Sequence, residues 1–227
     1  MLENFQKTFD THKVLRLLGA KKGRRVSPAS LRRVDLLTEG VEVMLEPQLS
    51  YRTLELIEVS SGSILLSGGT RFKSPKIAKA MARSETVCSF LATVGPAMDM
   101  EVKRLMQQQR YADAYVLDAV GSMSAESVVE QFYQRMARRQ AEKNGGVTMR
   151  FSPGYCDWSI RQQRQLFALF AETDTPDVVL NDRCLMSPRK SISGLFGLLP
   201  SGNKGVNPAY NPCNNCGKRD CIARRSN

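Results

Sequence analysis

From residue 97 to residue 143, apolar side chains recur at spacings of three and four, as in Met98 and Val102 and again in Phe132 and Met136. This spacing places them along one face of an α-helix. The stretch is too long for one ordinary helix, and the pattern favours two helices joined near residues 110–111. A chain with this much amphipathic helix must cover it with other elements, so the rest of the sequence decides the fold class.

Shorter β-rich segments account for much of that remainder. Residues 51–59 and 63–67 read as a hairpin across a Ser-Gly turn, and residues 86–94 form an apolar run that ends at Gly95-Pro96. Strands and helices are mixed without a regular βαβ rhythm or an internal repeat. The predicted fold class is therefore α+β: a single domain with a mostly antiparallel sheet flanked by long helices, plus a cysteine-rich C-terminal tail.

The ends of the chain differ from its middle. Asp10 is predicted to cap one N-terminal helix, and Ser30 is predicted to cap a second that runs as far as Leu45. We divide the chain into an N-terminal helical region at residues 1–50, an α+β core at 51–199 and a tail rich in Gly, Asn and Cys at 200–227.

Positive charge is concentrated at those ends. Of the formal net charge of +11, residues 13–33 contribute +8 because they contain no acidic residue, and residues 213–227 contribute the remaining +3. Two basic ends can steer an acidic partner, a phosphate-bearing ligand or RNA. A solvated basic surface is the commoner explanation, and we favour it over a dedicated nucleic-acid face.

Several function classes lack their signatures in this sequence. No apolar stretch approaches the ~20 residues of a membrane span, and the segment MLENFQKTFD has no signal-peptide core, so we expect a cytoplasmic protein. Phosphate-loop, dinucleotide-binding, zinc-protease and serine-hydrolase motifs are missing. His12 is the only histidine, and we do not expect it to act as an acid or base.

The segment RFSPGY at residues 150–155 has the parts of a turn that recognises an anion and a ring. Arg150 can form a bidentate contact with a carboxylate, and Gly154 lets the backbone approach a ligand. Tyr155 offers a flat ring face and a hydrogen-bond donor. Pro-Gly turns with a neighbouring arginine are common, so the pattern alone is weak. Two further motifs accompany it, DAVGSMSAE at residues 118–126 and MSPRKSISG at residues 186–194.

In this order the three motifs resemble the activation domain of cobalamin-dependent methionine synthase, over residues 112–198. The resemblance implies binding of S-adenosylmethionine. It places the ligand's amino group on Glu126, its carboxylate on Arg150 and its adenosyl part against the backbone of Ser152 and Gly154, with Tyr155 in the same binding turn. The chain departs from the family at Cys156, and it carries Arg and Lys at 189–190 where the family has smaller residues.

The resemblance also implies what must come from elsewhere. Nothing in the chain resembles a cobalamin-binding signature, so the cobalamin would be supplied by a partner: a cobalamin-binding protein, or a methionine synthase that lacks its own activation domain. The expected function is to support reductive methylation of that cobalamin, with an electron donor as a further partner and no side chain acting as acid or base. A basic zinc- or RNA-binding interaction module without catalysis is the alternative.

Three cysteines close together in the tail, Cys213, Cys216 and Cys221, offer soft ligands for a metal. A zinc site would need a fourth ligand, whereas three thiolates suit an iron–sulfur cluster that borrows Cys184 or Cys156. A reduced tail without metal is an equal alternative. A disulfide framework is not expected in a chain without a signal peptide.

Overall fold

The structure is a computed structural model that describes residues 5–19, 26–171, 175–202, 205–206, 213 and 217. Its helices are α1 (Thr11–Leu17), α2 (Pro28–Thr38), α3 (Pro75–Met81), α4 (Ala97–Gln107), α5 (Tyr111–Glu142) and α6 (Gln163–Ala168), with 3₁₀ turns η1 (Val41–Met44) and η2 (Ile160–Gln162). Its strands are β1 (Gln48–Val59), β2 (Ser63–Leu66), β3 (Arg71–Lys73), β4 (Thr86–Thr93), β5 (Gly146–Val147), β6 (Val179–Leu180), β7 (Met186–Ser187), β8 (Ser191–Leu199) and β9 (Gly205–Val206).

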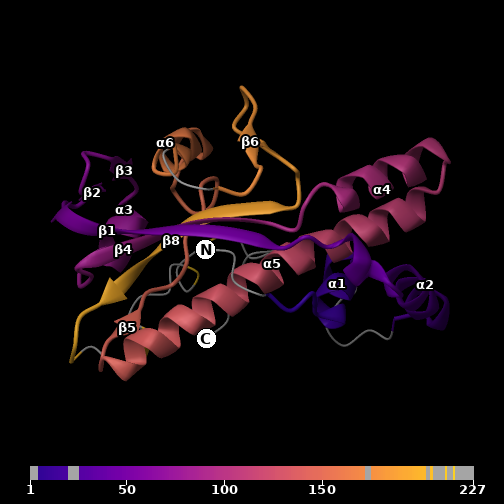
Figure 1. Ribbon diagram of the computed structural model, residues 1–227, viewed down its shortest axis with the longest axis horizontal. Helices are drawn as coiled ribbons and strands as arrows, with labels where there is room; N and C mark the ends of the chain where they lie inside the picture. The colour runs from indigo at the N-terminus through magenta and orange to yellow at the C-terminus, as the bar shows by residue number, and fades with distance from the viewer. Residues whose placement is uncertain are drawn as a thin grey trace. The chain divides into compact units, whose positions relative to one another are not determined.

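The strands of the main sheet follow the order β3-β2-β1-β4-β8-β5-β9 (Figure 1). The pairs β1–β2, β2–β3 and β5–β8 are antiparallel, and β5–β9 is parallel. Strands β6 and β7 form a separate antiparallel ribbon. The predicted α+β class with a mostly antiparallel sheet and long helices is confirmed. The tail of that prediction lies almost wholly outside the described residues, and the three-part division of the chain stays a prediction.

The chain forms two compact units. The first comprises Met1–Ser50, Ala92–Gln131 and Thr175–Ile192, and the second comprises Tyr51–Leu91, Phe132–Asp174 and Ser193–Asn227. The boundary falls within β1, β4, α5 and β8, so each of these elements contributes residues to both units. The units are therefore built from shared elements and do not follow one another along the sequence.

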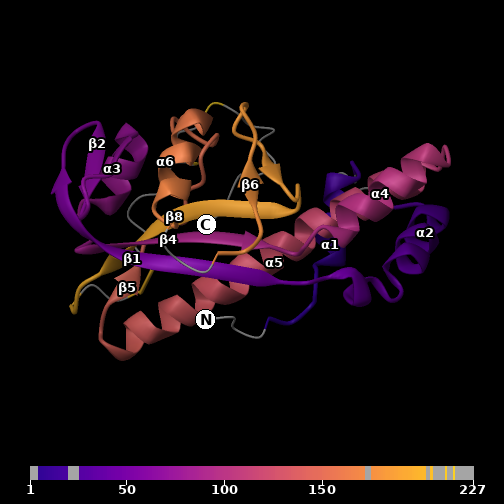
Figure 2. The same ribbon diagram turned by 45° about the horizontal axis from the view of Figure 1, so that its top comes forward.

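The core of the second unit forms around one aromatic side chain of α5. The ring of Phe132 lies 4.9 Å from Tyr51, 6.2 Å from Phe90 and 6.0 Å from Phe196, between ring centroids. These partners come from β1, β4 and β8. Strands β4 and β8 bury nearly every residue, which is typical of strands covered on both faces. Figure 2 shows α6 on the side of the sheet away from α5.

The first unit contains the N-terminal helices. The side chain of Asp10 caps α1 as predicted, accepting a hydrogen bond from the backbone of Lys13. The predicted cap at Ser30 is wrong: Ser27 caps α2 and Pro28 occupies its first turn, where the fixed φ of proline and its missing N–H are tolerated. Helix α2 ends at Thr38, and the rest of the stretch predicted as helix up to Leu45 contains the 3₁₀ turn η1 (Val41–Met44) instead of a continued helix.

Other local predictions had mixed outcomes. The break between two helices near residues 110–111 is confirmed, with Gln109 at φ 61° between α4 and α5. The hairpin of β1 and β2 and the strand β4 are confirmed as well. Strands β3, β7 and β9 were not predicted, because strands of two or three residues are too short to show an alternating pattern. Among the described helices, none is both long and apolar enough to cross a membrane.

Candidate functional site

The turn that follows β5 in the second unit holds four of the predicted site residues. Within this stretch, Phe151 pairs with Leu195 of β8 through two backbone hydrogen bonds of 2.8 and 2.9 Å. The backbone N–H of Tyr155 then donates to the carbonyl of Ser152 at 3.2 Å. Gly154 has φ +90°, a conformation that side chains with a Cβ rarely adopt, so the glycine is needed for the turn itself.

Two residues directly after the turn anchor it to the body of the unit. Trp158 is buried, and its ring meets that of Phe72 edge-on at 5.2 Å. Its backbone N–H donates to the carbonyl of Tyr155 at 3.1 Å. The carboxylate of Asp157 accepts hydrogen bonds from the hydroxyl of Ser74 and from the backbone N–H of Lys76 at 3.1 Å, at the start of α3. The turn is thus fixed by core packing and by a helix terminus.

A tyrosine of α5 positions the arginine of the turn. The guanidinium carbon of half-buried Arg150 lies 5.3 Å from the ring centroid of Tyr133, within the range of a cation–π contact. The hydroxyl of Tyr133 donates to the carbonyl of Thr148 at 2.8 Å. Because the same ring also packs edge-on against Phe196 at 5.2 Å, its orientation is set by the core. Arg150 therefore packs against a ring that cannot turn freely.

Gly194, in the third motif, allows the turn to approach β8. A Cβ at this position would lie 2.5 Å from the carbonyl oxygen of Phe151, 2.7 Å from the ring of Phe90 and 3.0 Å from the hydroxyl of Ser152. The first of these atoms belongs to the backbone and cannot move aside cheaply. The glycine in the motif is thus explained by close contact between β8 and residues 151–152.

The second and third motifs also meet, within the first unit. The ammonium of Lys190 lies 2.7 Å from Asp118 and donates to the hydroxyl of Ser122 at 3.0 Å. The side chain of Lys190 is 5% exposed and that of Asp118 is 32% exposed. Gly121 leaves space for the lysine stem, since a Cβ there would lie 3.1 Å from Lys190 Cγ. The lysine that departs from the family pattern is therefore a buried, paired residue.

The residues on either side of Lys190 are held in place by hydrogen bonds. The backbone N–H of Arg189 donates to the carboxylate of Asp99 at 2.5 Å. The hydroxyl of Ser191 donates to the carbonyl of Pro188 at 2.7 Å and is hydrogen-bonded to the hydroxyl of Thr93 at 2.9 Å. These bonds hold the loop before β8 against α4 and the end of β4.

The structure thus brings Arg150, Ser152, Gly154 and Tyr155 together in one turn, with Gly154 and Tyr155 exposed. The fifth predicted residue, Glu126, is exposed on α5 in the part of that helix that belongs to the first unit.

Sequence reasoning missed the residues that support the site. Trp158 could have been noticed, since it is the only tryptophan of the chain and follows the RFSPGY segment closely. Tyr133 and Asp157 carry no such signal, because their contacts with residues 148–150 and with α3 arise only from the folded chain.

The predicted metal ligands are only partly described. Cys213 is half-buried in a turn, whereas Cys216 and Cys221 lie outside the described residues. Within the part of the chain that the structure describes, no cluster of His, Cys, Asp and Glu could hold a metal ion. Of the two cysteines considered as borrowed ligands, Cys184 is buried and Cys156 is exposed. The metal site in the tail stays a prediction.

The fold defines a class of protein, an α+β domain with a long helix against a mostly antiparallel sheet. Among solved structures it is similar to the MetH reactivation domain, in a crystal structure with AdoHcy bound. That likeness has a TM-score of 0.57 at 13% sequence identity and covers 83% of this chain and 70% of that chain. No protein-family model matches the sequence, and a search of curated proteins found no match. At this identity the likeness shows the fold alone, over more of the chain than residues 112–198.

Proposed function

We propose that the protein binds S-adenosylmethionine and supports reductive methylation of cobalamin on a separate methionine synthase or corrinoid methyltransferase. The proposal rests on two features that occur together in this chain. A chain with the fold of a reactivation domain also has an arginine, held against a tyrosine ring, beside an exposed glycine turn. That neighbour was crystallised with AdoHcy, so its fold accommodates a ligand with an adenosyl group and an amino-acid group.

The residues of the turn have the chemistry that such a ligand needs. Arg150 presents a planar fork that suits a carboxylate, and its contact with Tyr133 reduces the entropy lost on binding. Gly154 is exposed and carries no side chain that would keep a ligand away from the backbone. Tyr155 is 55% exposed, and its ring can cover an apolar or aromatic group. Glu126 is proposed to take the amino group.

In this proposal the protein's contribution is positioning. S-adenosylmethionine would supply the methyl group, the partner's cobalamin would accept it, and a low-potential donor would supply the electron that makes the methylation reductive. Arg150 and the turn would fix the methyl donor's amino-acid end, and holding two reactants in line can lower a barrier by several kcal/mol. Such a role needs no general acid or base, which agrees with a sequence whose only histidine is His12.

Calorimetric titration with S-adenosylmethionine tests the proposal directly. Arg150→Ala should weaken binding at least about tenfold, because losing a charge-assisted contact costs roughly 1.5–3 kcal/mol. Arg161→Ala is the matched control, since Arg161 is an exposed arginine of the same unit outside the turn. Equal affinity in the two variants would mean that the RFSPGY segment is not the binding turn.

Activity is tested with a purified partner in its cob(II)alamin form, S-adenosylmethionine and a low-potential reductant. Methylcobalamin should form faster when this protein is present. Equal rates with and without it would refute the supporting role. Tight RNA binding that survives high salt, with no corrinoid partner retained, would favour the alternative of a basic interaction module.

A further inference from the structure

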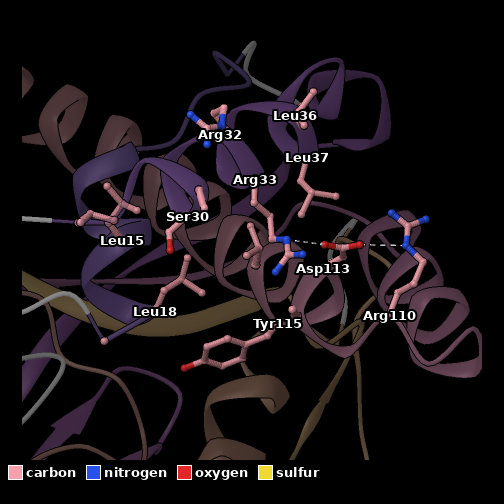
Figure 3. Close-up of a pocket in the computed structure, with 15 residues that line it drawn as sticks. Leu15, Leu18, Ser30, Arg32, Arg33, Leu36, Leu37, Arg110, Asp113 and Tyr115 are labelled. Carbon is pink, nitrogen blue, oxygen red and sulfur yellow. Dashed lines mark hydrogen bonds and ion pairs between the residues drawn. The ribbon is translucent and has the colours of Figure 1, made fainter.

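A hollow of about 890 Å³ opens in the first unit among α1, α2 and the start of α5 (Figure 3). Apolar side chains make up much of its lining, including Leu15, Leu37 and Val116. Leu36, also in the lining, is 72% exposed and adds apolar surface that a partner can cover. None of the lining residues belongs to the three motifs described above. The hollow is therefore distinct from the turn at residues 150–155.

Arginine dominates the charge of this surface. Its described lining contains Arg32, Arg33 and Arg110, and Asp113 is the only acidic residue among the described residues there. Both oxygens of Asp113 are already engaged, by Arg33 at 3.1 Å and by Arg110 at 2.9 Å, as the dashed lines of Figure 3 show. Arg32 is exposed. The hollow thus combines an apolar floor with a positive excess, and about half of its described lining comes from residues 13–33, a range whose sequence carries +8.

We propose that this hollow is a docking groove for an acidic amphipathic helix of a partner protein. Such a helix places one apolar face in a hydrophobic groove and leaves its charged face at the rim, where glutamates and aspartates would meet the arginines. The inference rests on the proposed function only in taking a partner protein as the occupant. An acidic partner is the one that the charge at residues 13–33 would steer.

Nucleic acid fits this surface less well. Single-stranded binding relies on aromatic platforms along a basic groove, and leucine side chains offer neither a stacking face nor a phosphate ligand. Among the lining residues that the structure describes, Tyr115 is the only aromatic one, and its hydroxyl donates to the carbonyl of Leu17 at 3.0 Å. The exposed Leu36 would gain from burial against an apolar side chain of a helix but not against a phosphate backbone.

The test uses three fluorescein-labelled synthetic peptides and fluorescence anisotropy at physiological ionic strength. The first has leucines at helical positions i, i+4, i+7 and i+11 and glutamates on the opposite face. The second replaces each glutamate by lysine, and the third replaces each leucine by serine. We expect the first peptide to bind at least about tenfold more tightly than either of the others.

Matched variants of the protein locate the binding. Leu36→Asp should weaken the first peptide at least about tenfold, and Met100→Asp should not, although Met100 is also a largely exposed apolar residue of a helix in the first unit. Arg32→Glu should weaken it more than Lys103→Glu, which makes the same charge change at an exposed site of α4. Circular dichroism of each variant confirms that it is folded.

Four results would overturn the inference. They are equal binding of all three peptides, unchanged binding in Leu36→Asp, displacement of the acidic peptide by an RNA oligonucleotide, and a concentration-dependent dimer that Leu36→Asp abolishes. Calorimetry with S-adenosylmethionine on the same preparations separates the two proposals. Intact ligand binding without peptide binding counts against the groove alone, and the reverse counts against the proposed function alone.

Discussion

Gly194 offers the sharpest test of the geometry around the turn. In Gly194→Ala the new Cβ would lie 2.5 Å from the carbonyl oxygen of Phe151 and 2.7 Å from the ring of Phe90. Real Cβ atoms essentially never approach heavy atoms this closely, so the strand or the turn must shift. Inserting a methyl group into a packed site costs about 1–3 kcal/mol.

A shift of the turn has a second cost. Phe151 is held to Leu195 by two backbone hydrogen bonds of 2.8 and 2.9 Å, and moving its carbonyl weakens at least one of them. A hydrogen bond contributes about 0.5–1.5 kcal/mol net. The two effects together predict that Gly194→Ala lowers the free energy of unfolding by roughly 2–4 kcal/mol. For a chain of 227 residues this corresponds to a fall in Tm of about 4–16 °C.

Urea unfolding followed by circular dichroism measures the loss, with Gly62→Ala as the control. A Cβ at Gly62 would meet nothing within 4 Å, yet the substitution removes the same backbone freedom from the unfolded chain. The control should change stability by no more than about 0.5 kcal/mol. If Gly194→Ala were as stable as Gly62→Ala, the close approach of β8 to residues 151–152 would be refuted. In the proposed function, Gly194→Ala should also weaken S-adenosylmethionine binding, because it displaces Ser152.

Three further predictions concern the buried ion pair and the thiols. Asp118→Asn should destabilise the fold more than Lys190→Met in urea unfolding, because it leaves the buried ammonium of Lys190 without its counter-charge. In Lys190→Met, by contrast, the side chain of Asp118 is 32% exposed and still has Arg189 at 3.7 Å. An equal loss would contradict this. Thiol titration of the folded protein should modify exposed Cys156 quickly and leave buried Cys88 and Cys184 unreacted until denaturant is added. Burial raises the pKa of Cys88, so above about pH 8.5 only the unfolded chain releases that proton. The free energy of unfolding should then fall by up to about 1.4 kcal/mol per pH unit, and Cys88→Ala should abolish this part of the pH dependence.

The sequence predicted those elements of the fold in which an apolar pattern repeats over several turns. Helices α4 and α5 show the 3.6-residue period over many turns, and their break was placed correctly near residue 110. The end of α2 was missed because the apolar residues after Thr38 continue the helical spacing, although Gly40, at φ 71°, starts a 3₁₀ turn instead. Apolar periodicity shows which residues face the core but does not distinguish an α-helix from a single 3₁₀ turn. A 3₁₀ turn can also direct its apolar residues to the core over that short length.

The candidate site was predictable in its motifs but not in its supports, and the difference has a physical cause. Arg150 and Gly154 can be recognised as candidates from residue type alone. Few residues other than arginine present a planar cationic fork, and few other than glycine adopt a left-handed backbone conformation. Tyr133 matters because the fold brings α5 beside the end of β5, a contact that no local pattern encodes. Lys190 also shows that sequence alone does not reveal tertiary contacts. By type and sequence it is a surface cation that breaks a family pattern, and only burial against Asp118, in space left by Gly121, makes it a structural residue. Departures from a motif therefore need the structure before they count against a function.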